Sequence, residues 1–211
     1  LGLLTSAYFL TFAAFQLPLG LLLDRYGPRR TDAALLLVAA FGALVFAAAP
    51  NGAALIGGRA LIGLGVSGCL MSGMKANVLW FPLARLPAMN GWMFFAGGAG
   101  MVLATLPVEL LLEAIGWRGL FFGLALLTLV SGLTVLRVVP ERKEHVLREP
   151  FSAQLAGLRS VFAARRFWQI GLAALTSQAT NMAVQGLWSG PWLRDVAGLS
   201  RQGAATHLLI M

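Results

Sequence analysis

Four polar side chains recur at helical spacing in an apolar stretch near the end of the sequence. Counted from the first, the others follow after three, seven and ten residues, so all four share one face of a helix. Amides inside a bilayer need hydrogen-bond partners, which a water-filled cavity or a neutral polar solute can supply. We therefore expect a stripe that lines a solute cavity, with hydrogen bonding between helices as the alternative. The four residues are Gln178, Asn181, Gln185 and Trp188.

Two ionisable residues, Arg59 and Glu109, also lie inside apolar stretches. A charge at the centre of a membrane helix costs on the order of 2.5 kcal/mol or more, so such residues usually face a cavity or a partner. Arg59 lies about two turns into its stretch, and Glu109 has a similar depth on the expected antiparallel neighbour. The two could form an ion pair. The alternatives are that Arg59 extends to the outer headgroups and that Glu109 lies at headgroup level.

Lys75 follows Arg59 in the same apolar stretch. Sixteen residues at 100° each place the two side chains about 160° apart on an ideal helix, so they form no common stripe. Because Lys75 also lies close to the end of the stretch at Trp80, we slightly favour an ammonium that extends to the headgroups.

Residues 20–30, with the sequence GLLLDRYGPRR, join two apolar stretches. Residues 1–23 contain no charge, and about 20 such residues suffice to cross a bilayer as a helix. Residues 33–49 are apolar again. Gly27 and Pro28 break the first helix and turn the chain, so the two spans are expected to form an antiparallel hairpin with its charges at headgroup level.

The hairpin carries a specific pattern, G-x-x-x-D-R-x-G-x-R-R, which resembles the one that major facilitator superfamily transporters have between their second and third helices on the cytoplasmic side. A short loop on the positive-inside face would collect arginines but leaves the acid and the glycines to chance. A second stretch, R-x-x-x-G-x-G at Arg59, Gly63 and Gly65, is similar to the pattern of the family's fourth helix, whose arginine is associated with proton coupling. The residues of the hairpin pattern are Gly20, Asp24, Arg25, Gly27, Arg29 and Arg30.

The apolar stretches divide the chain into two membrane parts and a linker. Residues 1–139 are expected to hold part of one bundle, with spans at about 1–23, 33–49, 53–79, 88–112 and 120–136. Residues 140–166 are rich in charge and proline, as is typical of a linker between domains. Phe151, Leu155, Leu158 and Phe162 recur there at helical spacing, which indicates either an amphipathic surface helix or an ordinary solvated linker. Residues 167–211 are expected to begin the second bundle.

The arginines and lysines are distributed unevenly between the two membrane faces. A cytoplasmic hairpin puts most of them on the cytoplasmic side, as the positive-inside rule requires. That side holds Arg25, Arg29, Arg30, Arg85, Arg137, Arg142, Lys143, Arg148, Arg159, Arg165 and Arg166, against Arg118, Arg194 and Arg201 on the other.

The composition excludes several functional classes. Of 211 residues, 58% are hydrophobic and 11% charged, more apolar than a soluble domain requires. The net charge of +8 lies in the gaps between apolar stretches rather than on one helix face, which argues against nucleic-acid binding. The single cysteine, Cys69, forms neither an internal disulfide nor a metal site alone. An enzyme is not expected, because the sequence has neither G-x-S-x-G nor H-E-x-x-H, and His145 and His207 lie far apart.

The resemblance implies an all-α polytopic membrane bundle, a partial facilitator fold that covers helices 2 to 7 and the start of helix 8, without the first helix and the last four. It also implies alternating-access transport of a small solute that is driven by protons, with a lipid bilayer as surroundings and no cofactor. We expect location in the bacterial cytoplasmic membrane. The substrate and the direction of transport are left open.

Drug and proton antiporters of the family carry G-x8-G-x3-G-P-x2-G-G in their fifth helix. Gly91 and Gly100 fit its first half, but Ala104-Thr105 and Val108-Glu109 replace the residues of its second half. We therefore keep the drug/proton efflux antiporter only as an alternative. Alternatives of other classes are an intramembrane enzyme and a receptor or fragment that does not transport.

Overall fold

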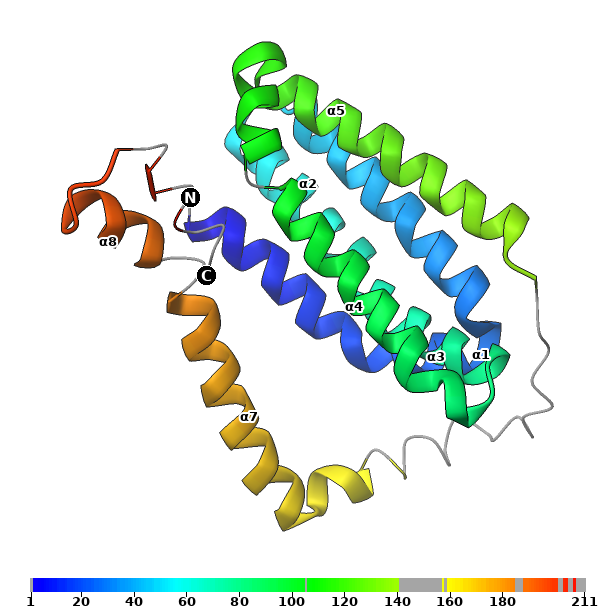
Figure 1. The fold of residues 1–211 in the computed structure, drawn as a ribbon. Coiled ribbons are helices and arrows are strands. Elements are labelled where there is room, and N and C mark those ends of the chain that lie inside the picture. Colours follow the sequence, from blue (N-terminus) through cyan, green and yellow to red (C-terminus); the bar gives the residue numbers. More distant parts are fainter. Residues whose placement is uncertain are drawn as a thin grey trace. The chain divides into compact units, whose positions relative to one another are not determined.

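The computed structural model describes residues 2–104, 106–140, 157, 159–184, 188–200, 203–204 and 207 (Figure 1). Every regular element among these residues is a helix. The chain divides into two compact units, Leu1–His145 and Val146–Met211, which are described separately below. The helices are α1 (Gly2–Ala47), α2 (Gly52–Val66), α3 (Cys69–Trp80), the 3-10 turn η1 (Leu83–Arg85), α4 (Leu86–Leu103), α5 (Leu106–Val138), α7 (Arg165–Ala183) and α8 (Ser189–Asp195).

α1 consists of two helical halves separated at Gly27. This glycine has a φ of 78°, a conformation that L side chains rarely adopt, and the following Pro28 has no N–H to donate. The Thr31 hydroxyl donates to the Leu22 carbonyl oxygen at 3.2 Å and so fastens the turn. Leu19 and Leu23 of the first half form a buried cluster with Leu35 of the second half.

α2 packs against both halves of α1 through glycines. A Cβ on Gly63 would lie 2.3 Å from the Tyr8 carbonyl oxygen in the first half, and one on Gly65 would lie 2.4 Å from the Ala39 nitrogen in the second. Small residues thus allow the backbones to approach closely, as is common between membrane helices. The Thr11 hydroxyl adds a hydrogen bond to the Ala60 carbonyl oxygen at 2.8 Å.

The stretch expected as one span over residues 53–79 is divided at Ser67 and Gly68. The Ser67 hydroxyl donates to the Leu64 carbonyl oxygen at 2.6 Å, and the Ser67 N–H bonds the same oxygen at 3.4 Å. A serine that bonds back to its own helix bends it, and glycine adds no stiffness. The Gln16 amide of α1 donates to the Ser67 carbonyl oxygen at 3.3 Å and so provides this break with a partner.

The expected span 88–112 is also interrupted, because α4 ends at Leu103 and α5 begins at Leu106. Pro107 explains the break, since a proline ring clashes with the carbonyl four residues earlier, here that of Leu103. α5 has a second break at Gly116, where φ is 67°. Its long second part runs beside the second half of α1, with Gly132 close to Leu36 (Figure 1).

Three segments of the described chain are long and apolar enough to cross a membrane: Gly2–Ala47, Gly52–Trp80 and Pro107–Val138. Many large apolar side chains on them are exposed, for example Leu126 and Leu127 of α5. Such side chains suit a lipid-facing surface. In the second unit, α7 does not meet the same criterion, and polar residues occupy much of its length. Of the expected amphipathic helix, Phe151, Leu155 and Leu158 lie outside the described residues.

Candidate functional site

The acid of the hairpin pattern forms an ion pair with a lysine from another helix. The Lys75 Nζ atom of α3 lies 2.6 Å from the Asp24 Oδ1 atom of α1. The Lys75 side chain is 23% exposed and that of Asp24 52% exposed. The position of Lys75 near the end of its apolar stretch predicts an ammonium that extends to the headgroups, whereas in the structure it pairs with Asp24. The signal that could have found the pair is depth, because both residues were expected near the hairpin side of the membrane.

The arginines of the hairpin pattern have different partners. The Arg29 guanidinium donates through Nη2 to the carbonyl oxygen of Leu136, in the last turn of α5. A cation at the C-terminal end of a helix interacts favourably with its unpaired carbonyls and its dipole. The Arg25 guanidinium lies over the Tyr26 ring at 5.6 Å. The hairpin pattern thus connects the turn of α1 to α3 through Asp24 and to α5 through Arg29.

A groove of about 390 Å³ lies between the first half of α1 and α3, and the Asp24–Lys75 pair forms part of its wall. Gly20 of the hairpin pattern belongs to its lining, with no Cβ to fill the space. The rest of the lining is mainly apolar and includes Leu23, Met74 and Val78. The groove therefore combines an apolar surface with one charged pair.

Arg59 of α2 lies beside a pair of neighbouring aromatic rings. Its Cζ atom is 4.9 Å from the centroid of the Phe46 ring of α1 and 5.3 Å from that of the Phe121 ring of α5. The two rings lie 4.3 Å apart, and Phe46 also meets the edge of Trp117 at 5.7 Å. Cation–π contacts of this kind offset part of the desolvation of a guanidinium. They also fasten three segments of the unit to one another.

The structure does not bring Arg59 and Glu109 together. Glu109 lies in the first turn of α5, next to Pro107, and no ion pair joins it to Arg59 among the described residues. An acidic residue in the first turn of a helix interacts favourably with the helix dipole, which gives Glu109 a local role. Sequence depth alone suggested the pairing, but the side chain of Arg59 is directed to the rings of α1 and α5.

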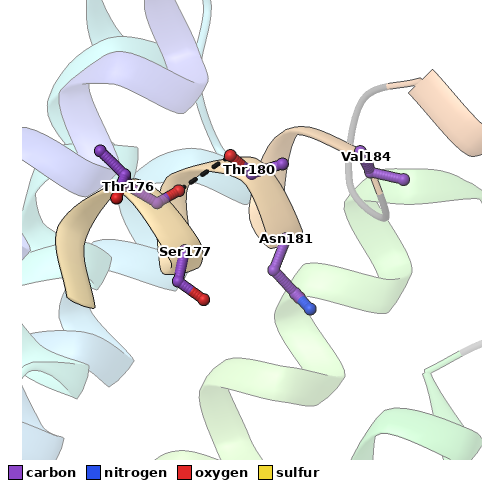
Figure 2. A pocket seen from close by; sticks show the side chains of 5 residues that line it. All are labelled: Thr176, Ser177, Thr180, Asn181 and Val184. Atoms are coloured by element: carbon purple, nitrogen blue, oxygen red, sulfur yellow. Dashed lines mark hydrogen bonds between the residues drawn. The ribbon is translucent and has the colours of Figure 1, made fainter. Parts of the chain in front are cut away.

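In the second unit, α7 presents an open polar hollow of about 590 Å³ (Figure 2). Ser177 and Asn181 point to the same side of the helix in this view. The Thr180 hydroxyl donates to the Thr176 carbonyl oxygen at 2.8 Å, so its own oxygen keeps acceptor capacity. The lining residues are Thr176, Ser177, Thr180, Asn181 and Val184.

The sequence predicts a helix here, but the expected polar stripe coincides with only part of the α7 face that lines the hollow. Asn181 lies in the hollow, whereas Gln178 is not part of its lining and Trp188 is 69% exposed beyond it. Gln185 lies outside the described residues. The hydroxyl residues were missed, although Thr176 and Thr180 recur at a spacing of four, which places them on one helix face.

The whole chain, residues 1–211, matches the sequence model of the family described as Major Facilitator Superfamily. The MFS-type transporter VdtG of Byssochlamys spectabilis is 33% identical over 150 residues, which cover 68% of this chain and 26% of that protein. The efflux pump apf11 of Gibberella fujikuroi is 28% identical over 159 residues, 72% of this chain and 28% of the pump. The efflux pump aflT of Aspergillus parasiticus is 30% identical over 155 residues, 74% of this chain and 29% of the pump.

The chain thus matches less than a third of the length of these relatives. They come from fungi, so they give no support to the bacterial cytoplasmic membrane that we expected from the sequence. The family match and the long apolar helices show an integral membrane protein with several spans.

Proposed function

The chain belongs to the major facilitator superfamily, and on that premise we propose that the complete protein transports a small solute across a membrane by alternating access. The observation that carries the proposal is the family match over residues 1–211, on a chain whose described helices include three that are able to span a bilayer. Transport in this family depends on two helix bundles that move around a central site.

The Asp24–Lys75 pair supports a gate at the hairpin end of the first unit. It joins α1 to α3 by a contact of 2.6 Å that water can reach, since half of the Asp24 side chain is exposed. A partly exposed pair is weak enough to break and re-form during a transport cycle. We propose that the pair stabilises one conformation of the gate and opens in another.

The polar hollow on α7 supports a neutral polar solute. Its lining offers hydroxyls and one amide and contains no charged side chain among the described residues. An uncharged solute could replace the water that these groups need inside a bilayer. We propose that Asn181 of α7 contributes to solute binding. We propose the same role for the other residues of the expected stripe, which are Gln178, Gln185 and Trp188.

We further propose that transport is coupled to protons. In the unit that carries the hairpin, Arg59 is the candidate residue for this coupling. The guanidinium contacts two neighbouring rings, and no carboxylate pairs with it among the described residues. The N–H groups at its edge therefore suit an acid that pairs with it in only one protonation state. We keep Glu109 as a possible partner in a conformation other than this one.

Export is the second candidate, and the names of two relatives favour it. The proteins apf11 and aflT are both described as efflux pumps. The departure from the antiporter pattern after Gly100 argues against this subclass. The direction of transport is therefore proposed from these names alone.

The test compares the culture media of cells that produce the complete protein with those of uninduced cells. We expect at least one small solute to change in concentration outside the cells. That solute is then assayed with purified protein in vesicles of phosphatidylethanolamine and phosphatidylglycerol, for exchange without a gradient and for accumulation with an imposed pH gradient. Absence of any exchange in the vesicles would refute transport, and exchange without pH-driven accumulation would refute proton coupling.

A further inference from the structure

Asp32 is an acidic residue of the second half of α1 that the gate and the solute hollow do not use. It lies five residues after the Gly27 turn, between the buried residues Thr31 and Ala33. Its Oδ1 atom is buried and has no hydrogen-bond partner among the described residues. A buried polar atom without a partner is rare in folded proteins and requires an explanation.

A second such atom comes from the neighbouring helix. Ser72 of α3 is only 2% exposed, and its hydroxyl oxygen is buried without a hydrogen-bond partner among the described residues. This hydroxyl lies close to the Asp32 carboxyl, to which it can donate when the carboxyl is ionised and from which it can accept when the carboxyl is neutral. The two helices thus bring together a carboxyl with one buried, unpaired oxygen and a buried hydroxyl.

We propose that Asp32 and Ser72 form a proton-binding site between α1 and α3. A proton from the aqueous phase binds the Asp32 carboxylate, and the negative charge is neutralised. The new O–H group donates to the Ser72 hydroxyl oxygen, which accepts. Release of the proton to water restores the carboxylate, so the step needs no other reactant. A neutral acid is far less costly than an isolated carboxylate in a buried site of a membrane protein.

The site fits a proton better than a metal cation. Magnesium and calcium ions take six or more oxygen ligands, whereas two side chains meet here. No group of three or more potential metal ligands exists among the described residues. A proton needs only one acceptor for binding and one more for its hydrogen bond.

No charged side chain among the described residues forms a salt bridge with the Asp32 carboxyl. Cys69 of α3 lies close to Asp32, but its thiol carries no charge at physiological pH. Arg29 donates to the Leu136 carbonyl oxygen, and Lys75 is bonded to Asp24. The charged or titratable residues of the packed helices are Cys69 and Lys75 of α3, Arg59 of α2, Glu109, Glu113, Arg118 and Arg137 of α5, and Tyr8, Asp24, Arg25, Tyr26, Arg29 and Arg30 of α1 itself.

The site also has a mechanical consequence, which rests on the proposed transport function. Ser72 and Lys75 lie three residues apart on α3 and share one side of it. In the position in which Lys75 reaches Asp24, the Asp32 Oδ1 atom is buried, and burial favours the neutral acid over the carboxylate. Binding of a proton therefore favours this position of α3, whereas loss of the proton favours a position in which water reaches the carboxylate and the gate opens.

The first experiment measures protonation and needs no substrate. The complete protein in vesicles of phosphatidylethanolamine and phosphatidylglycerol is titrated from alkaline to acidic pH and followed by infrared difference spectroscopy. We expect a C=O stretching band of a protonated carboxyl that appears on acidification, is lost in Asp32→Asn and is retained in the matched control Asp24→Asn. In Ser72→Ala the band should shift in frequency and in pH midpoint, because its hydrogen bond is lost.

Identical spectra for the unmodified protein and Asp32→Asn would overturn the site. If Asp32→Asn does not fold, Ser72→Ala decides: an unchanged frequency and midpoint would overturn it. The second experiment uses the solute identified by the transport assay, and Asp32→Asn should lose pH-driven accumulation while it retains exchange. Accumulation equal to that of the unmodified protein would overturn the coupling role, whereas absence of transport in the unmodified protein would refute the proposed function and leave the infrared result standing.

Discussion

Removal of the charge on Asp24 should weaken the contact between α1 and α3 by a modest and calculable amount. At the observed separation of 2.6 Å, two unit charges attract each other by about 1.6 kcal/mol in water. Water is the appropriate limit because half of the Asp24 side chain is exposed. Ordering of two side chains offsets part of this attraction, so we expect a net contribution of about 1 kcal/mol, or roughly fivefold in an equilibrium constant.

The assay is a double-mutant cycle on the complete protein. Asp24→Asn, Lys75→Gln and the double variant are compared by equilibrium unfolding in mixed detergent micelles. Each single variant should lose about 1 kcal/mol of unfolding free energy, and the double variant little more than either. Arg25→Gln is the control, because Arg25 contacts the adjacent Tyr26 ring and forms no ion pair among the described residues.

The same variants test the gate. Asp24→Asn should reduce solute exchange while expression is retained, because one conformation of the gate loses its pair. A coupling free energy indistinguishable from zero would show that the ion pair contributes nothing. Normal exchange rates in Asp24→Asn would refute the gate role even if the coupling is measurable.

Three further results are expected. Gly58→Ala should destabilise the protein by about 1–3 kcal/mol in the same unfolding assay, because its Cβ would lie 2.8 Å from the backbone of α1, whereas Gly57→Ala, with nothing within 4 Å, should not. Arg59→Lys should reduce pH-driven accumulation more than exchange, because an ammonium lacks the planar stack and the donor fork of a guanidinium; equal retention of both would indicate a purely structural side chain. Asn181→Leu should weaken solute binding measured by exchange kinetics, whereas Thr180→Val should have a smaller effect, since the Thr180 hydroxyl bonds its own helix.

The sequence predicted the family and the helical membrane fold because both depend on features that are read along the chain. Apolar stretches of sufficient length indicate spans, and the glycines, acid and arginines of residues 20–30 have fixed spacings that only a specific pattern explains. The family match and the helices of the structure confirm these two predictions. Where an apolar stretch breaks inside the membrane was not predicted, because Ser67 and Pro107 interrupt helices through local hydrogen bonding and ring geometry within otherwise apolar sequence.

The partners of individual side chains were harder to predict for a geometric reason. The sequence gives the depth of a residue along the membrane normal, but it does not give the rotation of each helix about its own axis. Soluble helices reveal that rotation through an apolar face, whereas these helices are apolar almost all round. Depth therefore suggested Glu109 for Arg59, while rotation places Arg59 over the Phe46 and Phe121 rings.

α3 is the element through which the gate and the buried carboxyl can influence each other. It is a short helix with a break at Ser67 and Gly68 at one end, and it carries Ser72 and Lys75 on one side. Movement of such a rigid segment about its break changes both contacts together, so the Asp24 pair and the Asp32 contact cannot respond independently. The proton then biases the gate because it binds more tightly in one position of α3 than in the other. It needs no contact with Asp24 to do so.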